Sequence, residues 1–150
     1  MNNDQQPIEV QTLGLTKVFG SGSQAIEIFK DMDLVIRRRD RIAIVGASGA
    51  GKTTLLHILG TLDKPTRGKV LYEGQDVFLW DEKVLAQFRN RHIGFVFQFH
   101  YLLPEFNALE NVVMPGLIAG LPVKETHDQA LYLLERLGLS DRLTHRIGEL

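Results

Sequence analysis

The chain has 150 residues, of which 44% are hydrophobic, and 17 basic and 18 acidic side chains give it a net charge of −1. Such a chain can form one globular domain with a core, and it has no overall charge that would attract nucleic acid or an anionic membrane. The absence of cysteine excludes disulfides and cysteine-ligated metals, and no apolar stretch approaches the roughly 18 residues of a membrane-spanning helix. We therefore expect a protein of the cytoplasm with no nucleic-acid partner.

The chain begins with a region of β character. Residues 1–7 are polar and predict a disordered lead-in, after which strand-like patterns cover residues 8–15, 25–29 and 32–36. A hairpin loop is predicted at Gly20 to Ser23. A further short apolar run, residues 41–45, is typical of a buried strand.

A glycine-rich motif follows this predicted strand and matches the pattern G-x-x-x-x-G-K-[ST]. Its residues are Gly46, Ala47, Ser48, Gly49, Ala50, Gly51, Lys52 and Thr53. The glycines allow successive N–H groups to point at phosphate oxygens, Lys52 supplies a charge for the β- and γ-phosphates, and the Thr53 hydroxyl is placed to ligate Mg²⁺. Thr54 can reach the α-phosphate side, and residues 54–59 predict a helix that Gly60 ends. The alternative is a plain glycine turn before a core helix.

The segment after this helix predicts a turn, a strand, a helix and a buried strand. The turn is Pro65-Thr66-Arg67-Gly68, the strand covers residues 69–72, and a second turn covers residues 73–76. Asp81 is the expected N-cap of a helix to residue 91. The apolar run 93–97 then predicts a buried strand that ends at Gln98, and ligands bind at such strand ends in open α/β sheets.

The last third of the chain predicts helices. Asn107 and Glu110 fit a variant of the capping box that opens a helix, which Gly120 ends, and Pro115 is expected to end or kink it. Residues 124–137 predict a second helix with apolar residues at helical spacing. The five histidines, His57, His92, His100, His127 and His145, show no ligand spacing, so we expect no metal site other than that for Mg²⁺.

Taken together, these features resemble the ATP-binding cassette of ABC transporters over essentially the whole chain. The amino-acid sequence of residues 97–112 is most similar to that of the lipoprotein-releasing branch of the family and of its macrolide-exporter relatives. The resemblance implies an α/β fold of the ABC-type P-loop NTPases. It places an N-terminal antiparallel β part and the phosphate-loop core at residues 1–98, and the Q-loop with the start of a helical subdomain at residues 99–150.

The resemblance also implies roles for individual residues. Phe19 lies where the family has an aromatic ring that stacks on adenine; a strand aromatic facing the core is the alternative. Gln98 corresponds to the glutamine that reaches Mg²⁺ or the attacking water and acts in catalysis with Lys52; a structural buried glutamine is the alternative. Residues 99–106, from Phe99 to Phe106, would flank the groove for a helix of the transmembrane subunits, or would simply pack under the helical subdomain.

The end of the chain departs from the family pattern. Leu150 looks like the first residue of an LSGGQ-type signature, and Ile147 stands where relatives usually have proline. No apolar strand ending in Asp-Glu follows the phosphate loop, so we expect a cassette that lacks the signature, the Mg²⁺-binding aspartate, the water-activating glutamate and the switch histidine. Such a segment could bind ATP without turning it over.

The function implied by the resemblance is an ATP-binding subunit that hydrolyses ATP as a homodimer with Mg²⁺. It would act on the cytoplasmic side of the bacterial inner membrane, bound peripherally to transmembrane subunits that release lipoproteins. A related macrolide-exporter or cell-division-type ABC complex is one alternative. A P-loop small-molecule kinase is another, which the roughly 40 residues of β character before the loop disfavour. A binding module without turnover is the third.

Overall fold

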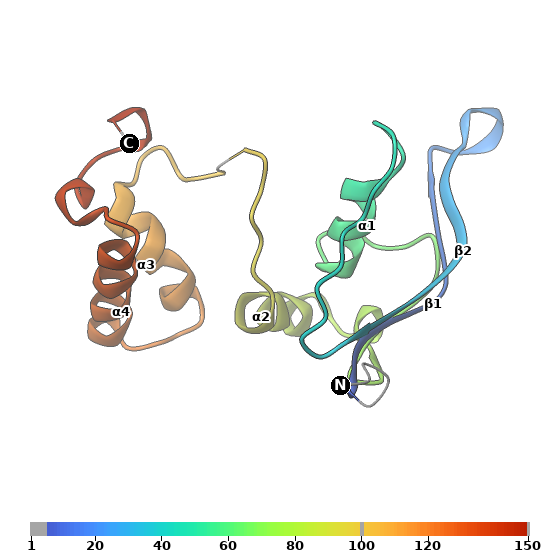
Figure 1. The fold of residues 1–150 in the computed structure, drawn as a ribbon, viewed down its shortest axis with the longest axis horizontal. Helices are drawn as coiled ribbons and strands as arrows, with labels where there is room; N and C mark the ends of the chain where they lie inside the picture. The colour runs from blue at the N-terminus through green and yellow to red at the C-terminus, as the bar shows by residue number, and fades with distance from the viewer. Residues whose placement is uncertain (1–5, 100, 150) are drawn as a thin grey trace. The chain divides into compact units, whose positions relative to one another are not determined.

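A long β-hairpin opens the computed structural model, which describes residues 6–99 and 101–149 (Figure 1). The described residues fall into two compact units, which divide between Ala86 and Gln87. The lead-in expected for residues 1–7 lies largely outside the described residues, as do His100 and the signature residue Leu150.

The first unit is built on a four-stranded antiparallel sheet in the order β2-β1-β3-β4. Its strands are β1 (Ile8–Phe19), β2 (Ile26–Arg37), β3 (Arg67–Tyr72) and β4 (Gln75–Asp76), and the 3-10 turn η2 (Gly22–Gln24) joins the first two. The predicted antiparallel β part is confirmed, but the two strands expected at residues 25–29 and 32–36 form one strand, β2. A bulge with Asp31 at φ 47° takes up the irregularity between them, because it lets the pairing with β1 continue on both sides.

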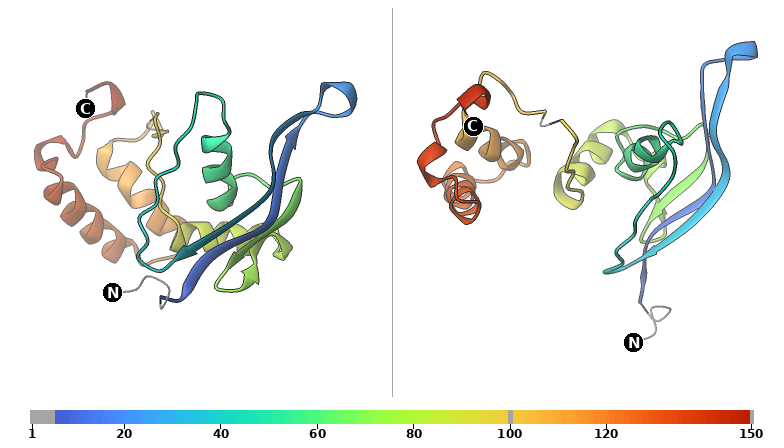
Figure 2. Two further views of the ribbon diagram at one scale, coloured as in Figure 1. Left: turned by 45° about the vertical axis from the view of Figure 1, so that its right-hand side comes forward. Right: turned by 45° about the horizontal axis from the view of Figure 1, so that its top comes forward.

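Helix α1 (Lys52–Leu59) lies beside this sheet in both views of Figure 2. The core of the unit combines Leu15 of β1, Ile58 of α1 and Val70 of β3, all fully buried. The hydroxyl of Tyr72 on β3 donates a hydrogen bond to the Leu59 carbonyl at 2.6 Å. As predicted, α1 ends at Gly60. The far end of the phosphate-loop helix is therefore attached to the sheet.

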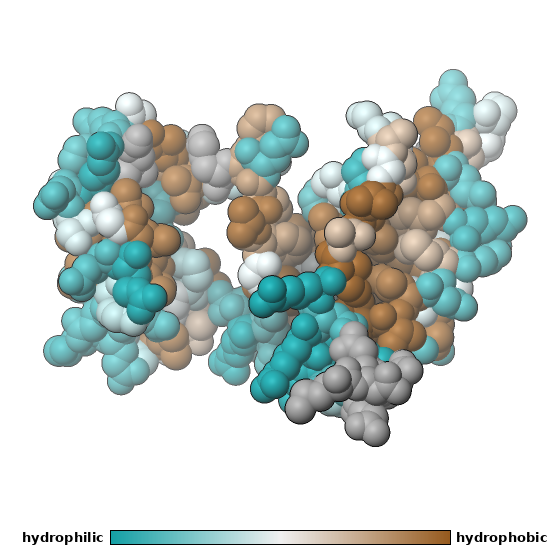
Figure 3. Space-filling model, viewed as in Figure 1, coloured by the Kyte–Doolittle hydropathy of each residue, from teal (hydrophilic) through white to brown (hydrophobic). Residues whose placement is uncertain are grey.

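Two predicted strands are absent from the structure. Residues 41–45 and 93–97 belong to no strand among the described residues, so the buried strands expected there are wrong. Val45 is 87% exposed, and Figure 3 shows apolar surface over the part of the first unit that includes α1 and the segment before it. A strand buried in a sheet needs hydrogen-bonded neighbours on both sides. Both runs have the side chains of such a strand, but no other described segment pairs with them.

The 3-10 turn η3 (Val77–Leu79) follows β4 and leads to α2 (Glu82–His92), which runs from the first unit into the second. The backbone N–H of Val84 donates to the Asp81 carboxylate at 2.9 Å, which confirms the predicted N-cap. The second unit continues with α3 (Ala108–Ile118), α4 (Val123–Arg136) and the 3-10 turns η4 (Ser140–Arg142) and η5 (Ile147–Glu149).

Helix α3 begins at the predicted capping box. Glu110 N–H donates to the Asn107 side chain at 2.9 Å, and Asn107 N–H donates to the Glu110 carboxylate at 2.8 Å. Pro115 does not end the helix, which continues to Ile118 because the Pro115 carbonyl still accepts from Ala119 N–H at 3.0 Å. Among the described residues, no helix has the length and apolar character needed to cross a bilayer.

Candidate nucleotide-binding site

The phosphate-loop motif forms an exposed turn that leads directly into α1. Gly51 is the N-cap of the helix at φ 84°, and Gly49 has φ 79°, a left-handed conformation that residues with a side chain rarely adopt. The first turn of α1 contains no acidic residue, so no carboxylate repels an anion from the free N–H groups of the helix start. The loop therefore has the backbone geometry of an anion site.

The ammonium group of Lys52 folds back over the start of this loop. Its Nζ donates to the Gly46 carbonyl at 2.9 Å and to the Ala47 carbonyl at 2.7 Å. These two bonds hold the positive charge of Lys52 beside the phosphate loop. The N–H groups of the same loop are the expected donors to an anion. Thr53 is exposed and Thr54 half-buried on the first turn of the helix, within the same unit. The structure thus brings together the phosphate-binding residues predicted from the motif.

The loop also rests closely on β2. A Cβ atom added to Gly51 would lie 2.3 Å from Ile28 Cγ2 and 3.5 Å from Phe29 Cδ1. A cavity of about 150 Å³ beside it is lined mostly by apolar residues, including Phe29, Met32 and Leu55. Strand β2 therefore packs directly against the phosphate loop, and only glycine allows this close approach at position 51.

Phe19, the predicted adenine-stacking residue, is the last residue of β1. It is 45% exposed, which does not fit the alternative of an aromatic facing the core. Lys17 Nζ lies 4.7 Å from the centroid of the Phe19 ring, and Lys17 itself is buried. Lys17 was not singled out from the sequence. Its position two residues before Phe19 was the available signal, because alternate residues of a strand share a face.

Gln98 belongs to the second unit, whereas Phe19 and residues 46–54 belong to the first. It is exposed and follows a segment that forms no strand, so the prediction of a buried strand end at this residue is wrong. The neighbouring aromatic rings contact one another, with Phe97 stacked on Phe95 and edge-on to Tyr101, both at 5.0 Å between centroids. Phe99 is 67% exposed and Tyr101 is 70% exposed.

The residues present fit Mg²⁺ held chiefly by a nucleotide. Within residues 6–99 and 101–149, no three histidine or acidic side chains gather as a metal cage. Mg²⁺ does not need such a cage, because it commonly binds phosphate oxygens and waters together with one or two protein oxygens. The exposed Thr53 hydroxyl, one residue after Lys52, is an oxygen of this kind.

Burial raises the pKa of Tyr72 to about 12, with a smaller contribution from the negative charge of Glu9. The phenol therefore keeps its proton and its hydrogen bond to Leu59 at physiological pH. This bond ties the last residue of α1 to β3, so the helix that begins at the phosphate loop is also attached at its other end.

The family model described as ABC transporter matches residues 29–150. The chain belongs to the ABC transporter family. It is 55% identical over 141 residues to the lipoprotein-releasing system ATP-binding protein LolD of Syntrophus aciditrophicus (strain SB), covering 94% of the chain and 63% of that relative. It is 53% identical over 141 residues to the LolD protein of Geobacter metallireducens, with the same coverage.

Solved ABC cassettes have the same fold. The dimeric, post-hydrolysis structure of the ATP-binding cassette MJ0796 with ADP and Pi matches with a TM-score of 0.85 and 34% identity, over 94% of this chain and 62% of that one. These comparisons confirm the predicted ABC-type P-loop fold and the resemblance to the lipoprotein-releasing branch. The chain spans 63% of the length of the first LolD relatives.

Proposed function

We propose that the intact protein is the ATP-binding subunit of an ABC transporter that couples ATP hydrolysis to lipoprotein release from the bacterial inner membrane. The observation that carries the proposal is the phosphate loop on α1, with the Lys52 ammonium held over it by two loop carbonyls. The 55% identity to a LolD protein supports the lipoprotein-releasing branch over the macrolide-exporter and cell-division types.

The proposed roles follow from the charges that the loop presents. The N–H groups at the start of α1 and the Lys52 ammonium bind the triphosphate and stabilise the negative charge that develops on the γ-phosphate oxygens. The Thr53 hydroxyl ligates Mg²⁺, which when bound neutralises charge on the β- and γ-phosphates. Thr54 contacts the α-phosphate side, Phe19 stacks on adenine, and Gln98 orients the attacking water and contacts the metal.

We further propose a homodimer that docks on transmembrane subunits through residues 99–106 and stays peripheral to the inner membrane. The related MJ0796 cassette is described as dimeric, which supports pairing of two copies. Exposed Phe99 and Tyr101 provide apolar surface of the kind that protein partners cover. On this proposal, residues 1–98 serve as the β part and nucleotide core, and residues 99–150 as the Q-loop and helical subdomain of one ABC domain.

Lys52→Ala tests the proposal in the intact protein. We expect steady-state ATP hydrolysis to fall on the order of 100-fold, since a charge that stabilises the transition state is lost. Lys69→Ala, on an exposed site of β3, removes a charge of the same sign away from the loop and should leave hydrolysis unchanged. Undiminished hydrolysis by Lys52→Ala would contradict the proposed site. ATP binding without any hydrolysis by the wild type would instead favour a binding module.

The transported substrate needs a separate measurement. With its membrane subunits in reconstituted vesicles, the wild-type protein should release an embedded lipoprotein when ATP is added, and Lys52→Ala should not. ATP hydrolysis that proceeds normally without lipoprotein release would retain the ABC ATPase and reject the lipoprotein branch.

A further inference from the structure

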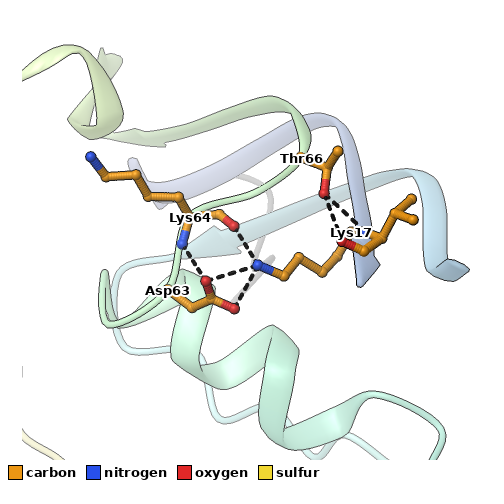
Figure 4. Close-up of polar contacts among 5 residues, drawn as sticks. Lys17, Asp63, Lys64 and Thr66 are labelled. Carbon is orange, nitrogen blue, oxygen red and sulfur yellow. Dashed lines mark hydrogen bonds and ion pairs between the residues drawn. The ribbon is translucent and has the colours of Figure 1, made fainter. Parts of the chain in front are cut away.

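Lys17 is a buried cation that is held by two hydrogen bonds and an ion pair (Figure 4). Its Nζ donates to Asp63 Oδ1 and to the Lys64 carbonyl, each at 2.8 Å, and lies 2.7 Å from Asp63 Oδ2. Two of the three N–H bonds of the ammonium group are therefore directed at oxygen acceptors, and the Asp63 carboxylate balances its charge. Lys17 is 7% exposed, and this set of partners holds its ammonium in one place.

The partners of Lys17 lie in the segment that leaves α1. The backbone N–H groups of Leu62 and Asp63 both donate to the His57 carbonyl in the last turn of the helix, at 2.8 and 3.3 Å. The Asp63 carboxylate also accepts from Lys64 N–H at 2.8 Å. Lys17 therefore joins β1 to the far end of the helix that begins at the phosphate loop.

Thr66 adds a second attachment between the same two segments. Its N–H donates to the Thr16 carbonyl at 2.9 Å, and its hydroxyl accepts from Val18 N–H at 2.9 Å. Figure 4 shows the bonds of the Thr66 hydroxyl near the backbone of Lys17 and the Asp63 ion pair at the tip of the Lys17 side chain. Thr66 thus bonds the backbone of both neighbours of Lys17, Thr16 and Val18, and Val18 directly precedes Phe19.

Phe19 itself pairs with Ile26 of β2, and this is the last pair of the β1–β2 ladder. It is the last residue of β1, Gly20 follows at φ 77°, and strand ends of this kind open readily. The Lys17 ammonium, 4.7 Å from the ring centroid, is attracted to one face of the ring and restricts its orientation. A planar base can then stack on the opposite face.

We propose that Lys17, anchored by Asp63, is a positioning residue that holds the Phe19 ring at a fixed place relative to the phosphate loop, so that base and phosphates of one nucleotide are bound together. This inference rests on the proposed nucleotide site. It assigns Lys17 and Asp63 no contact with the nucleotide, and Lys17 acts on it only through Phe19.

The test compares two ligands that share phosphates but not a base. Calorimetric titration of the intact protein measures the affinities for Mg-ATP and for Mg-tripolyphosphate. Lys17→Met keeps the unbranched side chain and removes the charge, so we expect the ATP affinity to fall about 3- to 30-fold, the range of a partly to fully desolvated cation–π contact. The tripolyphosphate affinity should stay within about 2-fold of wild type, because the phosphate loop is untouched.

A double-mutant cycle then asks whether Lys17 acts through the ring. In the Phe19→Ala background, Lys17→Met should lower the ATP affinity by no more than about 2-fold. Lys69→Met, which removes an exposed lysine from the same sheet, is the matched control and should change neither affinity. If Lys17→Met does not fold, Asp63→Asn provides the test, because it keeps the Lys17 ammonium but weakens the ion pair that holds it. This variant should lower the affinity for Mg-ATP and leave the affinity for Mg-tripolyphosphate unchanged.

The outcomes separate this inference from the proposed function. An equal loss of ATP and tripolyphosphate binding, no loss of either, or a full additional loss in the Phe19→Ala background would overturn the positioning role. A wild-type protein that binds neither ligand would overturn the nucleotide site and the positioning role together.

Discussion

Gly51→Ala tests whether packing against β2 shapes the phosphate loop. Alanine at φ 84° costs about 1–2 kcal/mol in backbone strain. The new Cβ would also lie 2.3 Å from Ile28 Cγ2, well inside contact distance, and such overpacking costs about 1–3 kcal/mol. We therefore expect the free energy of unfolding of the first unit to fall by about 2–5 kcal/mol. Mg-ATP affinity should fall as well, because the loop must move away from the sheet.

Two further variants separate the strain from the clash. Gly74→Ala has nearly the same φ, 83°, with no atom within 4 Å of the added Cβ, so it should cost only the strain, about 1–2 kcal/mol. Ile28→Leu removes the Cγ2 atom at nearly constant volume. The double variant Gly51→Ala with Ile28→Leu leaves Phe29 Cδ1 as the nearest atom, at the ordinary distance of 3.5 Å, and should recover about 1–3 kcal/mol.

Urea denaturation followed by tryptophan fluorescence measures these differences, since the only tryptophan, Trp80, lies in the first unit. The reasoning is refuted if Gly51→Ala costs no more than Gly74→Ala. It is also refuted if Ile28→Leu recovers none of the loss.

Two other predictions concern the attachments of α1 and α3. Folding raises the pKa of Tyr72 to about 12, so the contribution of this shift to the free energy of unfolding is complete below pH 10 and is lost as the pH rises through 12. Discounted for the partial exposure of the side chain, this contribution is about 1–2 kcal/mol. The difference in unfolding free energy between wild type and Tyr72→Phe should therefore shrink from pH 8 to pH 12, and a constant difference would contradict the shift. In the second unit, a Cβ on Gly116 would lie 2.4 Å from Thr126 Cγ2. Gly116→Ala should lower the protection of α3 amides in hydrogen exchange by about 1–2 kcal/mol despite better helix propensity, and Thr126→Ala should restore it.

Several features of the fold and site followed from local sequence. The phosphate loop was recognisable because its glycines, Lys52 and Thr53 act within one turn and the start of one helix. The caps at Asp81 and Asn107 were predicted for the same reason, since each side chain bonds a backbone group three residues away. Exposure of Phe19 at the end of β1 agrees with the role implied by the family resemblance, which remains a proposal.

Other features depended on partners far along the chain. The apolar runs 41–45 and 93–97 have strand-forming side chains, but a strand exists only where a neighbour supplies hydrogen bonds, and no described segment does so. The ion pair of Lys17 joins residues 46 positions apart, which strand alternation alone does not indicate. Sequence by itself determined the chemistry of the phosphate loop, because that chemistry is local. Only the tertiary structure decided what supports the loop and the ring of Phe19, because those contacts form between segments that folding brings together.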